Sequence, residues 1–232
     1  MRSTLALEVE GDSLVRTGAD LAVAGVFRDQ RPLGGGAGLA DWRLCGWLSG
    51  LLEASRMRGD LGEGVLVLTH GRLGAPRLLL LGLGMRARYG ADAHRQVVRD
   101  AVLRILELGA GSAALDLPAP IADPSPERVA GGLLAGAFEA LEARPAHVLL
   151  RIVAPPGFSP RLRSALEQTA AALPKGSTSL KLLRAPAGPP ARAHEVPAAR
   201  SADAAAARGT EPKRPPEGRR GSEPSASARG TP

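Results

Sequence analysis

Short apolar runs alternate with segments of helical periodicity over the first 183 residues of the chain. Six of these runs have the length and the leucine and valine content of strands. Several are apolar at every position, which is typical of strands covered on both faces of a parallel sheet. We therefore predict strands at Leu5–Val9, Leu21–Val26, Val65–Leu68, Leu78–Leu81, Ala113–Leu117 and Val148–Val153.

The first helical segment repeats apolar residues every three to four positions, the spacing of one helix face. This stripe consists of Leu39, Trp42, Cys45, Leu48 and Leu52. The spacing predicts a single helix from about Gly38 with the stripe packed against the core. Cys45, between two tryptophans, is then expected to be a small core residue.

Three further segments show the same periodicity, over residues 97–108, 129–141 and 162–173. Ser125 and Pro126 precede the second of these, and a serine cap followed by proline is a common helix start. Strands that alternate with helices through short connections predict one α/β domain with a mostly parallel sheet covered on both faces. We place this three-layer domain at residues 1–183.

The composition changes at about residue 184. Residues 184–232 are rich in Pro, Ala, Gly, Ser and Arg and contain almost no large apolar side chain. Such a segment cannot bury enough apolar surface to offset the entropy of ordering, so we predict a disordered tail. Hydrophobic residues make up 44% of the whole chain, enough for a sizeable core in the preceding domain.

The net charge of +7 is spread unevenly along the chain. Residues 1–183 carry +3 and the much shorter predicted tail carries +4. The nearly balanced domain argues against a folded nucleic-acid-binding module, although the basic tail could contact nucleic acid weakly. A single cysteine excludes an internal disulfide, and no apolar run reaches the roughly 20 residues of a membrane span. We therefore expect a cytoplasmic location.

Two glycine-rich loops are the candidate ligand sites. The stretch "PLGGGAGLADWRL" follows a predicted strand and leads into a helix, and "LLLLGLGMRARYG" ends another strand. Free amides at a helix N-terminus can bind phosphate, but the spacing fits neither the dinucleotide fingerprint nor the Walker motif. A flexible turn remains the alternative. The candidate contacts are Gly34, Gly35, Gly36, Gly38, Gly82 and Gly84.

Other chemistry-bearing residues form no catalytic or metal-binding pattern. The four histidines lie in distant segments, none at metal-ligand spacing from another His, Cys or carboxylate. The acidic pairs Glu8 with Glu10 and Glu139 with Glu142 are interpreted as solvent-facing charges. We therefore predict no catalytic residue, no metal and no cofactor.

Taken in order, the segments resemble the N-terminal domain of the leucyl aminopeptidases. In that family a strand "AD-x-x-V-x-G-V-F" leads through a small-residue loop to a helix. A "G-E-x-x-x-L" strand and a "P-R-x-L-L-x-G-L-G" strand follow, before a loop with tyrosine. The corresponding segments here are Ala19–Phe27, Gly62–Leu68 and Pro76–Gly84, with Tyr89 after them. The likeness covers roughly residues 18–155 and implies a fold similar to the macro domain.

The resemblance also implies what this chain lacks. In the aminopeptidases, the metal ions and the catalytic Lys and Arg belong to a C-terminal domain with an "N-T-D-A-E-G-R-L"-type motif. No such motif occurs here, and the chain contains no Asn. We therefore expect a free-standing domain without peptidase activity, a binding or assembly module that associates with itself or with an aminopeptidase-type partner. Two alternatives remain open: a macro-like binder of ADP-ribose or another nucleotide, and the non-catalytic part of a split metallo-aminopeptidase.

Overall fold

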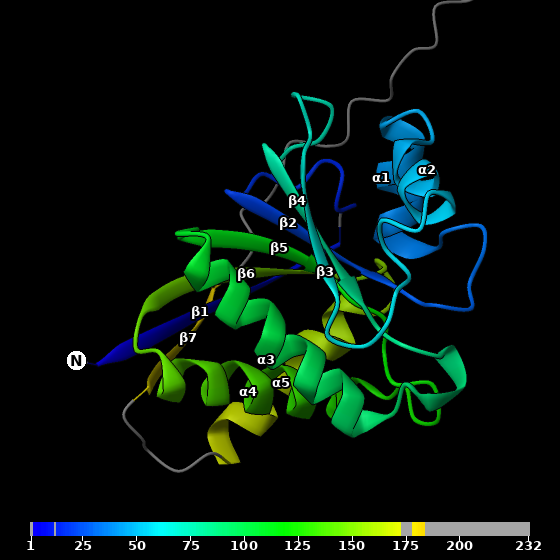
Figure 1. The fold of residues 1–232 in the computed structure, drawn as a ribbon. Coiled ribbons are helices and arrows are strands. Elements are labelled where there is room, and N and C mark those ends of the chain that lie inside the picture. Colours follow the sequence, from blue (N-terminus) through cyan, green and yellow to red (C-terminus); the bar gives the residue numbers. More distant parts are fainter. Residues whose placement is uncertain (1, 12, 173–177, 184–232) are drawn as a thin grey trace, which may run out of the picture. The chain divides into compact units, whose positions relative to one another are not determined.

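A seven-stranded sheet runs through the part of the chain that the computed structural model describes, residues 2–11, 13–172 and 178–183 (Figure 1). The strands follow the order β3-β4-β2-β5-β6-β1-β7, and only the β3–β4 pair is antiparallel. The bounds are β1 Ser3–Glu10, β2 Leu21–Val26, β3 Gly64–Leu68, β4 Arg77–Gly82, β5 Ser112–Asp116, β6 His147–Val153 and β7 Thr178–Leu183. The predicted α/β class with a mostly parallel sheet is confirmed.

All six predicted strands are present, and β7 is an additional strand that the sequence did not predict. It lies at the edge of the sheet beside β1, with Leu5 opposite Leu180. Only every second residue of β7 is partly buried, so Leu180 and Leu182 pack on one face while Ser179, Lys181 and Leu183 are exposed. A short, half-exposed edge strand gives too weak an apolar signal to be recognised.

Helices cover the two faces of the sheet unequally (Figure 1). One face packs against α3 (Ala91–Glu107), α4 (Pro126–Ala143) and α5 (Ser159–Ala172) in a core that includes Leu5, Leu21 and Ile105. The other face packs against α1 (Gly35–Arg43) and α2 (Trp47–Glu53) over β2, β4 and β5, burying Ala24 and Leu80. A short 3-10 helix, η1 (Arg86–Arg88), precedes α3. The result is the predicted three-layer arrangement.

The first predicted helix is two helices, and its predicted buried stripe is wrong. The chain turns at Cys45 and Gly46, which have φ of 58° and 80°, outside the helical region. The Asp41 carboxylate at the end of α1 accepts hydrogen bonds from the backbone N–H groups of Leu48 and Ser49, and so caps α2. Because of this turn, Leu48 and Leu52 are buried while the rest of the stripe faces outward.

The exposed residues around this turn include both tryptophans of the chain. Trp42 is 76% exposed, Trp47 49% and Leu39 47%. Cys45 is also exposed, with its Sγ 3.0 Å from a guanidinium nitrogen of Arg72, which corrects the prediction of a core cysteine. The predicted tail, residues 184–232, lies outside the described residues.

Candidate functional site: a pocket at the glycine loop

The first glycine loop lines a pocket at the carboxyl ends of β2 and β5. These parallel neighbours end at Val26 and Asp116, and the chain after β2 returns through the loop to start α1. The pocket has a volume of about 190 Å³. We call it the glycine-loop pocket; it is lined by Gly25, Phe27, Gln30, Gly34, Gly35, Gly36, Arg86, Asp116, Pro118 and Ile121.

Close packing within the loop explains two of its glycines. A Cβ at Gly36 would lie 2.6 Å from Oδ2 of Asp116, and one at Gly34 would lie 2.5 Å from Nε2 of Gln30. Gly35 has a φ of 55°, which favours glycine at the start of α1. The absence of a side chain at Gly36 therefore allows the Asp116 carboxylate to lie against the N-terminus of α1.

Asp116 is the chemically distinctive group of this pocket, and the sequence did not predict it. Burial raises the pKa of its carboxyl group to about 6, while a hydrogen bond from the Gly36 backbone N–H opposes the shift. No side chain caps α1, whose N-cap is Gly34. An aspartate from β5 thus places negative charge at the N-terminus of α1, where the helix dipole favours it.

The remaining candidate glycines lie outside the pocket. Gly38 sits within α1, where a Cβ would collide with the Leu33 carbonyl oxygen. Gly82 and Gly84 lie against the segment 59–63, with the Gly84 N–H donating to the Gly59 carbonyl and the Gly82 N–H to that of Glu63. The structure therefore brings together Gly34, Gly35 and Gly36 but not Gly82 and Gly84, and ligand binding by any of them stays a prediction.

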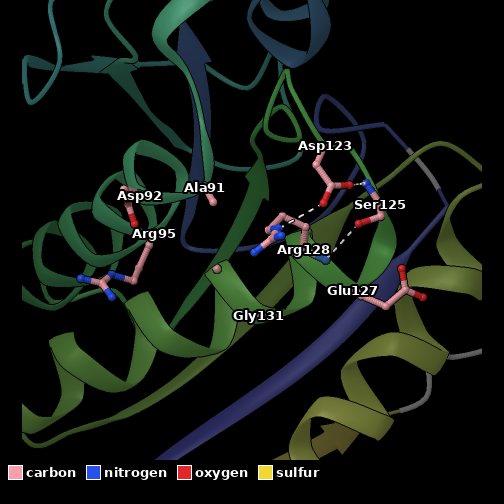
Figure 2. A pocket seen from close by; sticks show the side chains of 9 residues that line it. Ala91, Asp92, Arg95, Asp123, Ser125, Glu127, Arg128 and Gly131 are labelled. Carbon is pink, nitrogen blue, oxygen red and sulfur yellow. Dashed lines mark hydrogen bonds and ion pairs between the residues drawn. The ribbon is translucent and has the colours of Figure 1, made fainter.

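A second pocket, of about 340 Å³, lies where the N-termini of α3 and α4 meet (Figure 2). Its polar side chains largely pair with one another. Asp123 accepts hydrogen bonds from the Ser125 N–H and the Arg128 side chain, and Ser125 Oγ accepts from the Arg128 N–H at 3.4 Å. This confirms the predicted Ser125 cap, with Pro126 at the first helical position. These contacts explain the cluster as a helix start.

The cap gives a first test of the structure. Replacing Ser125 with alanine removes the acceptor for the Arg128 N–H and should lower the free energy of unfolding by about 1 kcal/mol. Ser164→Ala is the matched control, since Ser164 is exposed within α5, where alanine favours the helix. Urea unfolding followed by circular dichroism measures both. An equal effect of the two substitutions would contradict the capping role.

A family model described as "Cytosol aminopeptidase family, N-terminal domain" matches residues 23–144, more than half of the chain. The chain belongs to the cytosol aminopeptidase family. A probable cytosol aminopeptidase of Geobacter sp. (strain M21) is 33% identical over 133 residues, which cover 57% of this chain and 27% of that protein. The chain thus spans about a quarter of the length of this curated relative.

Solved structures show the same fold. A mutant of tomato leucine aminopeptidase matches with a TM-score of 0.50 and 18% identity, over 74% of this chain and 37% of that one. A mutant of the Oceanobacillus iheyensis macrodomain matches with a TM-score of 0.53 and 11% identity, over 72% and 93% of the two chains. The cytosol aminopeptidase N-terminal domain described here therefore has a macrodomain-like fold, as the resemblance implied.

A buried aromatic cluster in this aminopeptidase-family domain joins α3 to the loop before it. The Tyr89 hydroxyl lies 3.0 Å from Nδ1 of His94, and Phe27 packs edge-on against Tyr89. Burial lowers the pKa of His94, which is 1% exposed, to about 4, while backbone groups of Pro118 and Val129 oppose the shift. His94 is therefore neutral at pH 7, and its Nδ1 and the Tyr89 hydroxyl share a hydrogen bond.

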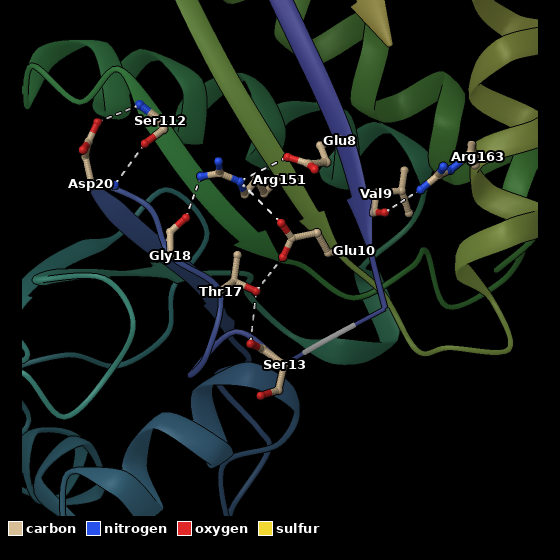
Figure 3. A network of polar contacts seen from close by, with 10 residues as sticks. All are labelled: Glu8, Val9, Glu10, Ser13, Thr17, Gly18, Asp20, Ser112, Arg151 and Arg163. Atoms are coloured by element: carbon tan, nitrogen blue, oxygen red, sulfur yellow. Dashed lines mark hydrogen bonds and ion pairs between the residues drawn. The ribbon is translucent and has the colours of Figure 1, made fainter. Parts of the chain in front are cut away.

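A polar network joins β1 and β6 and includes Glu8 and Glu10, which were predicted to face solvent (Figure 3). Glu8 is 4% exposed rather than solvent-facing. Arg151 of β6 lies 3.2 Å from Glu8 and 3.4 Å from Glu10, and also donates to the Gly18 carbonyl. Thr17 donates to Glu10 at 2.9 Å. The network ties the loop between β1 and β2 to the sheet.

Two further observations on this cytosol aminopeptidase domain concern candidate metal-binding groups and membrane-spanning helices. Within those ranges, no three His, Cys, Asp or Glu side chains gather in a group able to hold a metal ion. In the same part of the chain, no helix has both the length and the apolar character needed to cross a membrane.

Proposed function

We propose that this chain is a non-catalytic binding or assembly module of the cytosol aminopeptidase family. The observation that carries the proposal is the exposed apolar surface of α1 and α2. Leu39 and Trp42 lie three residues apart on one face of α1, and Trp47 begins α2. Exposed tryptophans of this kind commonly mark protein interaction sites, because they bury much apolar area at low cost in side-chain entropy.

Charge beside this surface suits a protein partner with acidic groups. The Arg43 guanidinium lies 5.6 Å from the Trp42 ring centre, and Arg72 contacts the turn at Cys45. Tryptophan and arginine are the side chains most enriched among residues that dominate binding energy at protein interfaces. We therefore propose docking either of a second copy of this chain or of an aminopeptidase-type partner, as the family relationship suggests.

The proposed docking can be tested with purified full-length chain. We expect sedimentation velocity to show self-association, or association with the Geobacter cytosol aminopeptidase, that Trp42→Ser combined with Trp47→Ser weakens at least about tenfold. The control is Leu68→Ser, at a 57% exposed leucine on β3, away from α1 and α2. If the double variant and the control associate equally well, this surface is not the interface, and if neither partner binds, the proposal fails.

Nucleotide binding has less support in the structure. The Asp116 carboxylate already accepts from Gly36, at the helix N-terminus where a phosphate would bind. A phosphate there would meet a carboxylate of the same sign, which raises the cost of bringing it into a partly buried site. A third possibility is that this chain is the non-catalytic part of a split metallo-aminopeptidase. In that case, adding the separate catalytic domain should give metal-dependent hydrolysis of leucine-p-nitroanilide.

A further inference from the structure

The glycine-loop pocket combines one negative charge, one positive charge and an apolar wall. Asp116 lies at the end of β5, and Arg86 comes from η1 on the other glycine loop. Phe27, Pro118 and Ile121 supply apolar surface to the same cavity. Such a set recognises a small molecule that carries both charges and an apolar group.

Neither charge is neutralised by an ion pair within the described part of the chain. Asp116 contacts the Gly36 N–H, which is a single neutral donor for a partly buried carboxylate. The Arg86 backbone N–H donates to Asp29, and Arg86, an exposed residue, is among those that line the pocket. A buried carboxylate without a cation is costly, and a bound ammonium group would reduce that cost.

Size and charge both restrict the ligand. A volume of about 190 Å³ lies below the roughly 300–1,000 Å³ of sites for drug-sized ligands, which favours a molecule smaller than a nucleotide. The carboxylate at the N-terminus of α1 favours a cationic group there over a phosphate. Arg86 can hold a carboxylate through two parallel hydrogen bonds.

We propose that the glycine-loop pocket binds a free α-amino acid with an apolar side chain. Its ammonium group pairs with Asp116, and its carboxylate pairs with Arg86. The side chain packs against Phe27, Pro118 and Ile121. This site is separate from the exposed surface of α1 and α2, so it goes beyond the proposed docking role and does not depend on it.

Calorimetric titration of the full-length chain with L-leucine at pH 7.5 tests the assignment. We expect saturable binding of L-leucine and at least about tenfold weaker binding of N-acetyl-leucine, which lacks the ammonium group, and of leucinamide, which lacks the carboxylate. The analogues keep the apolar side chain, so they separate charge recognition from hydrophobic adsorption. ADP-ribose is the competing probe.

Two variants and their matched controls locate the site. Asp116→Asn and Arg86→Gln should each weaken L-leucine binding at least about tenfold. Asp123→Asn and Arg88→Gln remove the same charges outside the pocket and should bind like the original chain. Asparagine at position 116 keeps an acceptor for the Gly36 N–H and removes a buried charge, so this variant is expected to fold.

The pH dependence of binding adds a readout that a structural role would not give. With a pKa of about 6, Asp116 is ionised at pH 7.5 and becomes protonated as the pH falls, after which it cannot pair with an ammonium group. Affinity should therefore drop about tenfold per pH unit below 6. Arg86 is the other charged group that lines the cavity.

Each outcome bears directly on the assignment. Absence of binding at millimolar L-leucine, equal binding of N-acetyl-leucine, or unchanged binding by Asp116→Asn would overturn it. Tighter binding of ADP-ribose than of L-leucine would also overturn it, in favour of a nucleotide site. None of these results depends on a partner protein, so they are distinct from failure of the docking proposal.

Discussion

Arg151→Leu should lower the free energy of unfolding by about 3 kcal/mol or more, the largest effect that we expect from a single charged residue. The reason lies in what the substitution leaves behind. The Glu8 side chain is 5% exposed, and Arg151 lies 3.2 Å from its carboxylate. Without the guanidinium, a buried carboxylate loses its cation, and the Gly18 carbonyl loses a donor. Urea unfolding at pH 7.5 measures the loss.

Two further variants separate this explanation from a general effect of losing an arginine. Arg95→Leu removes a guanidinium whose partner, Glu139, is at the surface, with the two side chains 51% and 39% exposed, so it should cost less than about 1 kcal/mol. The double variant Glu8→Leu with Arg151→Leu should recover part of the loss, because the buried Glu8 charge is removed as well. Equal losses for Arg151→Leu and Arg95→Leu would contradict the argument. Both tryptophans are exposed, so circular dichroism is the better signal than tryptophan fluorescence.

Six of the seven strands and three of the four helical segments could be predicted because their signals are local and continuous. The run Leu78–Leu81 is apolar at every position, and in the structure it lies within β4 between two neighbours and under helices on both faces. The signal for the start of α4 was equally local, since Ser125 and Pro126 act within one turn of the helix. Such features depend on neighbours in the sequence, which a pattern can detect.

The errors arose where a distant residue or a turn decided the outcome. Glu8 is buried because Arg151, 143 residues later in the chain, lies beside it in the sheet. The first helix breaks at Cys45, a non-glycine residue with positive φ that the spacing of apolar residues does not reveal. Within α1 the buried residues are the small ones, Gly36, Ala37 and Ala40, so Trp42 faces solvent although its spacing from Leu39 and Cys45 matched a buried face.

Asp116 shows why the candidate site was only partly predictable. The glycines of the first loop were visible in the sequence, and three of them do line the pocket. The aspartate that gives the pocket its charge ends a different strand, about 80 residues further on. Its position follows from β5 pairing with β2, and the one available signal was a lone acidic residue at the end of an apolar run. Only the parallel sheet places that residue against Gly36.

The second large expected effect is on the free energy of unfolding at acid pH. His94 and Asp116 change this free energy in opposite directions. Between pH 6.5 and about 4, the unfolded chain protonates His94 while the folded chain does not, so stability falls as the pH falls. The pKa shift corresponds to a loss of about 3 kcal/mol across this window. Asp116 is the reverse case: its pKa rises on folding from 3.8 to about 6, so acidification through the same range favours the folded chain.

The two contributions can be separated by comparing variants over pH. Relative to the original chain, His94→Gln should gain stability as the pH falls from 6.5 to 4, because glutamine can accept from Tyr89 but does not titrate. Asp116→Asn should lose relative stability over the range from 6 to 4, and should be the more stable protein at pH 7.5. His147→Gln, at an exposed histidine in β6, controls for the loss of any histidine and should leave the curve unchanged. If the stability of His94→Gln changes with pH in parallel with that of the original chain over the whole range, burial of the neutral imidazole is not what limits stability in acid.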